Sequence, residues 1–176
     1  MLSSQLVLEG IGKVGRVEPR IEKEMIALLP RLRRFALALT RSMSAADDLT
    51  QSTVERAIAN LDKWRPGTRL DSWMYRIAHN LHRNEVRNQA TRGIKHGILQ
   101  MDTERALDGE RAMLARLELS AVSAAITQLP EDQREALLLV AVEGRSYRAV
   151  AEITGASVAA VTSRIARARE VLRGVV

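Results

Sequence analysis

Residues 146–172 contain two short helical patterns joined by one glycine, Gly155. Ser146 and Ser157 stand where the two helices would begin. Serine caps helices well because its hydroxyl accepts a hydrogen bond from a free backbone N–H. Glycine adopts the backbone angles of a tight turn at little steric cost. The inward residues of the first helix would be Val150, Ala151 and Ile153. The sequence therefore predicts a helix-turn-helix in this segment.

The second of these helices has one apolar and one polar side. Its apolar residues recur at steps of three and four: Val158, Val161, Ile165, Ala168 and Leu172. The other side carries Ala159, Ala160, Thr162, Ser163, Ala166 and the arginines at 164, 167 and 169. A helix that enters the major groove of DNA needs a slim leading end and cations that bind phosphates. A helical hairpin with a solvated basic face fits the same pattern, so these residues alone leave both interpretations open.

The composition favours an all-α protein. Hydrophobic residues make up 46% of the chain but aromatic residues only 3%, so the core would consist mainly of Leu, Ala, Val and Ile. The absence of cysteine excludes disulfides, thiolate catalysis and cysteine-ligated zinc. The chain has no apolar run of membrane-spanning length and no signal-peptide pattern. We therefore expect a cytoplasmic protein without membrane insertion.

The positive charge is concentrated in the middle of the chain. Residues 63–95 carry eight basic and two acidic side chains, a surplus equal to the net charge of +6 of the whole protein. This surplus lies outside the predicted helix-turn-helix, which indicates a second contact with a polyanion. A solvated basic helix face remains the alternative, although such faces usually mix both signs.

Hydrophobic periodicity divides the chain into four parts. Residues 1–20 contain three glycines and no lasting period, which is typical of a flexible extension. Residues 21–90 are predicted to form a helical domain. Residues 91–112 have scattered acids and no sustained apolar stripe, as expected of a linker. Helical periodicity returns in residues 113–176. The expected fold is thus two small helical domains joined by a flexible linker.

The first domain should begin with a helix over residues 21–40, kinked or restarted at Pro30. Ser44 followed by Asp47 resembles a helix start, with an N-cap and an acid three residues later. The inward residues of this second helix would be Val54, Ala57, Ile58 and Leu61.

Residues 63–70, with their Pro-Gly pair, are predicted to form a loop. Asp71 would cap a long helix that ends near Asn88. In the second domain, Pro130 would begin a helix and Gly144 would end it.

Three of the five aromatic residues of the chain, Trp64, Trp73 and Tyr75, lie inside the basic stretch. Single-stranded nucleic acid is bound by this combination, because bases stack on rings while phosphates contact cations. Trp73 is better interpreted as a core anchor. Trp64, in the loop between two cations, is the better candidate for base stacking.

Several segments resemble the extracytoplasmic-function sigma factors of bacterial RNA polymerase. The segments that resemble region two of this family are residues 47–51 (DDLTQ), 62–64 (DKW) and 73–81 (WMYRIAHNL). Those that resemble region four are residues 129–136 (LPEDQREA) and 163–169 (SRIARAR). The similarity extends from about residue 23 to residue 173, in the family's order. It implies a region two bundle in residues 21–90 and a region four helix-turn-helix in residues 113–176. It also implies a sigma factor that binds core RNA polymerase and directs promoter-specific initiation.

The resemblance assigns three sets of contact residues. The beta-prime coiled coil of the polymerase would contact Asp48, Gln51, Glu55 and Arg56. The opened strand of the minus-ten element would contact Lys63, Trp64, Arg65, Thr68, Arg69 and Asn80. The minus-thirty-five element would be read by Ser157, Ala159, Ala160, Thr162, Ser163, Ala166 and Arg167.

Three positions depart from the family's usual residues. Ser52 stands where many members have an acid, Thr162 where many have a basic residue, and Ala166 is small. The promoter sequence that this chain reads therefore cannot be copied from a relative. The family also implies contact with the beta flap, control by an anti-sigma factor, a stress or envelope response, no cofactor, and a monomer when free.

Two other classes of protein share parts of this sequence pattern. A LuxR-type regulator has a Gly-x-Ser pattern like that of residues 144–146 (GRS). Such a regulator also needs a receiver or ligand-binding domain. The N-terminal half of this chain lacks the alternating strands and helices of a receiver. An enzyme could use His79, His82 and Glu85 on one helix to hold a metal. With three histidines in all, no cysteine and a basic neighbourhood, a histidine pair on a helix surface is favoured, and we expect no enzymatic activity.

Overall fold

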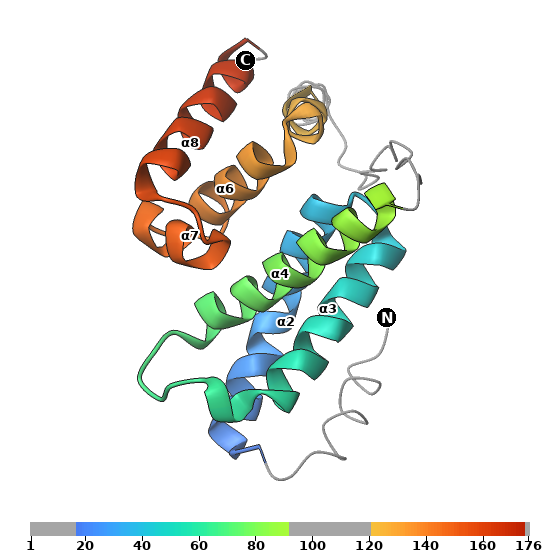
Figure 1. Ribbon diagram of the computed structural model, residues 1–176, viewed down its shortest axis with the longest axis vertical. Helices are drawn as coiled ribbons and strands as arrows, with labels where there is room; N and C mark the ends of the chain where they lie inside the picture. Colours follow the sequence, from blue (N-terminus) through green and yellow to red (C-terminus); the bar gives the residue numbers. More distant parts are fainter. Residues whose placement is uncertain (1–16, 92–120, 175–176) are drawn as a thin grey trace, which may run out of the picture. The chain divides into compact units, whose positions relative to one another are not determined.

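A computed structural model describes residues 17–91 and 121–174. The regular structure in these ranges is helical throughout, without strands (Figure 1). The chain divides into two compact units, one built around its first three long helices and the other around its last helices. This agrees with the all-α, two-domain expectation. Residues 1–16 and most of the predicted linker lie outside the described ranges.

The N-terminal unit is a bundle of α2 (Pro19–Thr40), α3 (Met43–Ala59) and α4 (Leu70–Thr91), each of which packs against the other two. Its core residues include Met25, Leu32, Phe35, Leu39, Val54, Ala57, Leu70, Met74, Tyr75 and Ala78. The rings of Phe35 and Tyr75 meet edge to face, with centroids 5.0 Å apart. This geometry is favourable for aromatic pairs and joins α2 to α4.

Three predicted boundaries in this unit differ from the structure. Helix α2 runs through Pro30 without a restart, because the buried stripe continues on both sides of this exposed residue. Helix α3 is capped by Ser42 instead of Ser44, since the Ser42 hydroxyl accepts a hydrogen bond from the N–H of Ala45 at 3.3 Å. Asp71 does not cap α4 but lies in its first turn.

The C-terminal unit contains helical residues 121–128, α6 (Glu131–Ala141), the part of α7 (Tyr147–Thr154) up to Ala151, and α8 (Val158–Arg173). The N-cap of α6 is Pro130, as predicted, and Gly144 follows the helix with a positive φ of 63°. Helix α6 packs against α8. The buried residues of this unit include Leu129, Ala136, Leu139, Val150, Val161, Ile165 and Ala168.

Candidate nucleic-acid interface

The predicted helix-turn-helix is confirmed in its local detail. The Ser146 hydroxyl accepts a hydrogen bond from the N–H of Ala149 at 3.2 Å, and the Ser157 hydroxyl accepts one from Ala160 at 3.1 Å. Gly155, between the two helices, has a φ of 68°, a left-handed conformation that a side chain rarely adopts. The start of α8 therefore follows from short-range signals in the sequence.

One side of α8 is buried and the other faces out. Val161, Ile165 and Ala168 are at most 1% exposed. Val158 was expected on the same buried stripe but is 47% exposed, and Leu172 is half-buried, because only the middle of the helix is covered. The exposed residues of the predicted reading face are Ser157, Ala159, Thr162, Ser163, Ala166 and Arg167, while Ala160 is half-buried.

The reading face is small in its first two turns. The Thr162 hydroxyl donates a hydrogen bond to the carbonyl of Val158 at 2.9 Å, so its proton is used within the helix. What Thr162 can offer a base edge is a methyl group and the lone pairs of its oxygen. Arg167 is exposed one turn further along.

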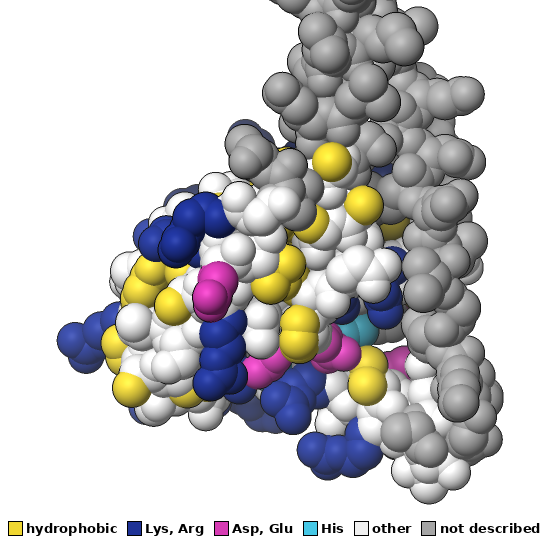
Figure 2. Space-filling model, turned by 90° about the horizontal axis from the view of Figure 1, so that it is seen from above, with side chains coloured by type: hydrophobic (Ala, Val, Ile, Leu, Met, Phe, Trp, Pro, Cys, Tyr) yellow, Lys and Arg dark blue, Asp and Glu magenta, His cyan; other side chains and the backbone are white. Residues whose placement is uncertain are grey.

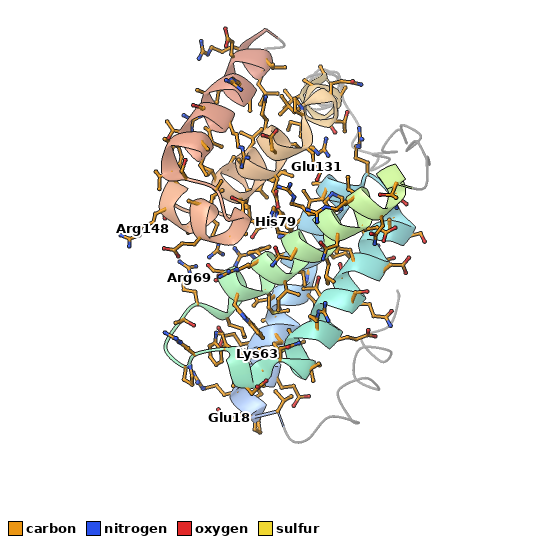
Figure 3. The ribbon with its side chains drawn as sticks, in the orientation of Figure 1. Glu18, Lys63, Arg69, His79, Glu131 and Arg148 are labelled. Carbon is orange, nitrogen blue, oxygen red and sulfur yellow. The ribbon has the colours of Figure 1, made fainter. Side chains whose placement is uncertain are left out.

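The loop between α3 and α4 carries the predicted minus-ten residues. It begins with a 3-10 turn, η1 (Leu61–Lys63), and contains Gly67 with a φ of 90°. Figure 3 labels Lys63 and Arg69 on this connection. The exposed residues of the predicted set are Lys63, Arg65, Thr68, Arg69 and Asn80. Four of these five side chains are thus presented to solvent by the loop itself, and Asn80 by α4.

Trp64 does not have the exposed position that base stacking requires. Its side chain is buried, with 7% of its surface accessible, and in the described ranges its indole Nε1 has no hydrogen-bond partner. Trp73, expected as the core anchor, is half-buried. The expectation that Trp64 is exposed for base stacking is therefore wrong for this structure. A large ring placed in a short loop serves here to anchor the loop to the bundle.

Hydrogen bonds within the loop hold its polar residues. The Lys63 ammonium donates to the amide oxygen of Asn60 at 2.6 Å, and the Thr68 hydroxyl donates to the carbonyl of Arg65 at 2.7 Å. The guanidinium of Arg69 binds the carboxylate of Asp71 through two nitrogens, at 3.2 and 3.0 Å. The hydrogen bond from Arg69 to Asp71 raises the pKa of the Arg69 guanidinium.

The predicted polymerase contacts lie together on one side of α3. Asp48, Gln51, Glu55 and Arg56 are all exposed. The Gln51 amide donates to the Glu55 carboxylate at 2.9 Å, which links residues one turn apart. Asp47, the first acid of the same motif, instead pairs with Arg33 of α2 at 2.6 Å. The two adjacent acids thus have different environments.

A pocket of about 400 Å³ lies beside this side of α3, within the N-terminal unit. Its lining comes from the last residue of α2, the first ten residues of α3 and the second half of α4, and includes Asp48, Ser52, His82 and Glu85. His79 and His82 are buried, at 4% and 9% exposure, so their interpretation as a surface pair is wrong.

The described surface carries cations among apolar side chains. Figure 2 shows Lys and Arg side chains interspersed with hydrophobic ones and fewer Asp and Glu. No helix in the described ranges has the length and apolar character that crossing a membrane requires.

Comparison with known proteins agrees with both units. Residues 119–172 match the family model "Sigma-70, region 4", and residues 25–79 match "Sigma2 domain of PhyR". The ECF RNA polymerase sigma factor EcfG of Rhodopseudomonas palustris is 38% identical over 154 residues, which cover 86% of this chain and 82% of that protein. The chain belongs to the extracytoplasmic-function sigma factors. The ECF RNA polymerase sigma-E factor of Haemophilus influenzae is 34% identical over 90% of each chain.

Solved structures give the same result for this sigma factor. The sigma factor RpoE of Bartonella quintana, in complex with the anti-sigma factor NepR, matches with a TM-score of 0.75 and 28% identity, covering 89% of this chain and 96% of that one. CnrH in complex with the cytosolic domain of CnrY matches with a TM-score of 0.60 and 26% identity, covering 96% and 93%. The sigma factor interpretation holds, and the LuxR-type alternative is not favoured.

Two ion pairs between helices were not predicted from the sequence. The ion pairs Arg33–Asp47 and Arg164–Asp132 each join two helices of one unit. Their partners are 14 and 32 positions apart in the sequence, so no local pattern indicates them. Asp47 and Asp132 lie inside motifs that the resemblance identified, but it assigned them no role.

Proposed function

We propose that the sigma factor uses three separate surfaces during promoter-specific initiation. The exposed side of α3, with Asp48, Gln51, Glu55 and Arg56, docks on the beta-prime coiled coil of core polymerase. Charged side chains at the rim of an interface mainly set the association rate and the specificity of docking. The polymerase supplies the chemistry, so the chain needs no catalytic group of its own.

The loop after α3 engages the opened minus-ten strand. Lys63, Arg65 and Arg69 supply cations for phosphates, and Thr68 and Asn80 supply polar groups for base edges. The buried Trp64 holds this loop in place. The turn at Gly67 keeps the cations on the surface, which supports capture of a strand that has left the duplex.

The outer face of α8 reads the minus-thirty-five duplex, and this is the best-supported of the three assignments. It is carried by one observation: the α8 residues expected to face DNA are exposed, apart from the half-buried Ala160, on a helix whose opposite side is buried. An anti-sigma factor controls access to these surfaces, as the complexes of the two related sigma factors suggest. The regulated genes belong to a stress or envelope response.

Reconstituted transcription tests the proposal. Core polymerase with the full-length chain should initiate at discrete sites in a library of genomic promoters of the source bacterium, and core alone should not. If the chain added no start sites to those of core alone, the proposal would be overturned. Charge reversal of Glu55 to Lys should remove the added start sites by preventing docking, while the variant remains folded by circular dichroism.

A further inference from the structure

Arg164, in the second turn of α8, is held by an acid from another helix. Its Nε lies 3.0 Å from Oδ2 of Asp132, in the first turn of α6. The Arg164 side chain is 24% exposed and that of Asp132 is 49% exposed. The pair therefore joins the beginning of α6 to the helix that faces DNA.

The neighbouring arginine on the same side of α8 behaves differently. Residues three apart on a helix are neighbours, so Arg164 and Arg167 lie one above the other. Arg167 is exposed, whereas Arg164 turns toward α6 and sits beside the buried stripe of Val161 and Ile165. Two residues of the same type thus have different surroundings, which points to different tasks.

We propose that Arg164 and Asp132 form a positioning pair that sets the rotation of α8 about its own axis, and that Arg164 is not a phosphate contact. This inference rests on the proposed reading of the minus-thirty-five element by α8. Arg164 and Asp132 thereby influence which bases are selected, although neither residue touches DNA.

The physical need for such a pair follows from the buried side of α8. Val161, Ile165 and Ala168 are buried, and apolar burial is not directional, so it sets the rotation of α8 less finely than a hydrogen-bonded ion pair does. Side-chain atoms lie about 5–6 Å from a helix axis, so a rotation of about 20° moves them by about 2 Å. Hydrogen bonds to a base edge form only at donor–acceptor distances of about 2.7–3.2 Å, a window about 0.5 Å wide, so a displacement of about 2 Å would break them. A planar guanidinium, whose N–H groups point in fixed directions, restricts this rotation.

The test compares full-length variants bound to core polymerase. The variants are Arg164→Gln, Asp132→Asn and the double change, and the measurements are promoter affinity over a salt series and base preference on DNA randomised at the minus-thirty-five element. Each single change should weaken binding about two- to fivefold, as expected for a partly exposed pair. The double variant should be no weaker than either single one. All three should relax the same base preferences, with the salt slope unchanged.

Two exposed residues of α8 provide matched controls. Arg167→Gln removes an arginine from the exposed side and should lower the salt slope by about one without relaxing base preference. Glu170→Gln removes a carboxylate from the same helix and should tighten binding at low salt, because a negative charge near DNA is lost.

Tighter promoter binding by the Asp132→Asn variant would overturn the inference. If Arg164 binds phosphate, then Asp132→Asn releases it and tightens binding as Glu170→Gln does, and Arg164→Gln lowers the salt slope. Arg164→Lys keeps the positive charge, and it provides the test if the Arg164→Gln variant does not fold. A phosphate contact predicts wild-type selectivity for the lysine variant, and a positioning pair predicts relaxed selectivity. If the wild-type protein adds no start sites, the proposed function is wrong. If the wild type is functional and the variants keep its affinity and base preference, only the positioning pair is wrong.

Discussion

Arg33 and Asp47 join α2 to α3 through both oxygens of the carboxylate, with Nε 2.6 Å from Oδ1 and Nη2 3.3 Å from Oδ2. This two-point geometry is the most specific that an arginine forms with an acid. The hydrogen bond to Asp47 raises the pKa of the Arg33 guanidinium. Because this pKa is raised, the contribution of Arg33 to stability would be lost only at strongly alkaline pH. Asp47 therefore joins two helices of its own unit, whereas the adjacent Asp48 is exposed.

Asp47→Asn should destabilise the fold modestly. The two side chains are 43% and 30% exposed, so solvent screens the pair, and we expect a loss of at most about 1 kcal/mol in the free energy of unfolding. Chemical denaturation of the full chain measures this loss. Arg34→Gln, at the exposed neighbour of Arg33, should change stability by less than about 0.5 kcal/mol. Equal effects of the two changes would mean that the ion pair does not contribute.

Asp48→Asn should weaken docking on core polymerase while leaving the fold intact. Removing one exposed charge from an interface is expected to reduce affinity by about 1 kcal/mol, or about fivefold, and more at low salt. Titration of labelled sigma factor with core polymerase at two salt concentrations gives the affinity. The control is Glu24→Gln, an exposed carboxylate on α2. If the control loses as much affinity as Asp48→Asn, the effect is one of net charge and not of the α3 surface.

Trp64→Ala should unfold the N-terminal unit or destabilise it by about 3–5 kcal/mol, because a buried ring leaves a cavity. Fluorescence tests its location more directly. In a Trp73→Phe protein, Trp64 is the only tryptophan, and its emission should be blue-shifted and protected from acrylamide. Addition of a nontemplate-strand oligonucleotide to this variant, free of core polymerase, should leave the emission of Trp64 unchanged. Strong quenching by the oligonucleotide would restore base stacking as the role of Trp64.

Thr162→Val should alter base preference and leave affinity for the phosphate backbone unchanged. The Thr162 hydroxyl donates to the Val158 carbonyl, so only its lone pairs are lost to DNA, while the methyl contact is kept. We expect a change of about 1–3 kcal/mol at no more than one base pair of the minus-thirty-five element, and an unchanged salt slope. Selection from randomised DNA measures the preference. An identical preference in Thr162→Val would show that the hydroxyl does not accept from a base.

Local signals explain which parts of the fold could be predicted from the sequence. The turn at Gly155 and the caps at Ser146 and Ser157 need only residues within a few positions of one another, and they are confirmed. The cap of α3 needed more information, because Ser42 and Ser44 are both acceptable by type. The choice depends on the end of α2, where Arg41 takes a left-handed φ of 57° and leaves Ser42 extended.

Tertiary packing explains the errors in the candidate site. Residues from other helices decide whether a loop tryptophan points into a bundle or away from it. The sequence alone therefore could not show which of Trp64 and Trp73 is the more buried. The same is true of Val158, which has the right spacing for the buried stripe but lies beyond its covered part. The acids Asp47 and Asp132 find partners on other helices, and no periodicity shows such pairs.

The small, exposed residues on the outer side of α8 allow new binding preferences to evolve. Ala159, Thr162, Ser163 and Ala166 contribute little to the interior, and substitutions at such positions usually change stability by no more than about 0.5 kcal/mol. A duplicated gene could therefore accumulate changes at these four codons without losing a folded product. Insertions or deletions within α8 are different, because each one turns the rest of the helix by about 100° and moves the buried stripe out of phase. Divergence among descendants of this chain should thus proceed by replacement at a fixed helix length.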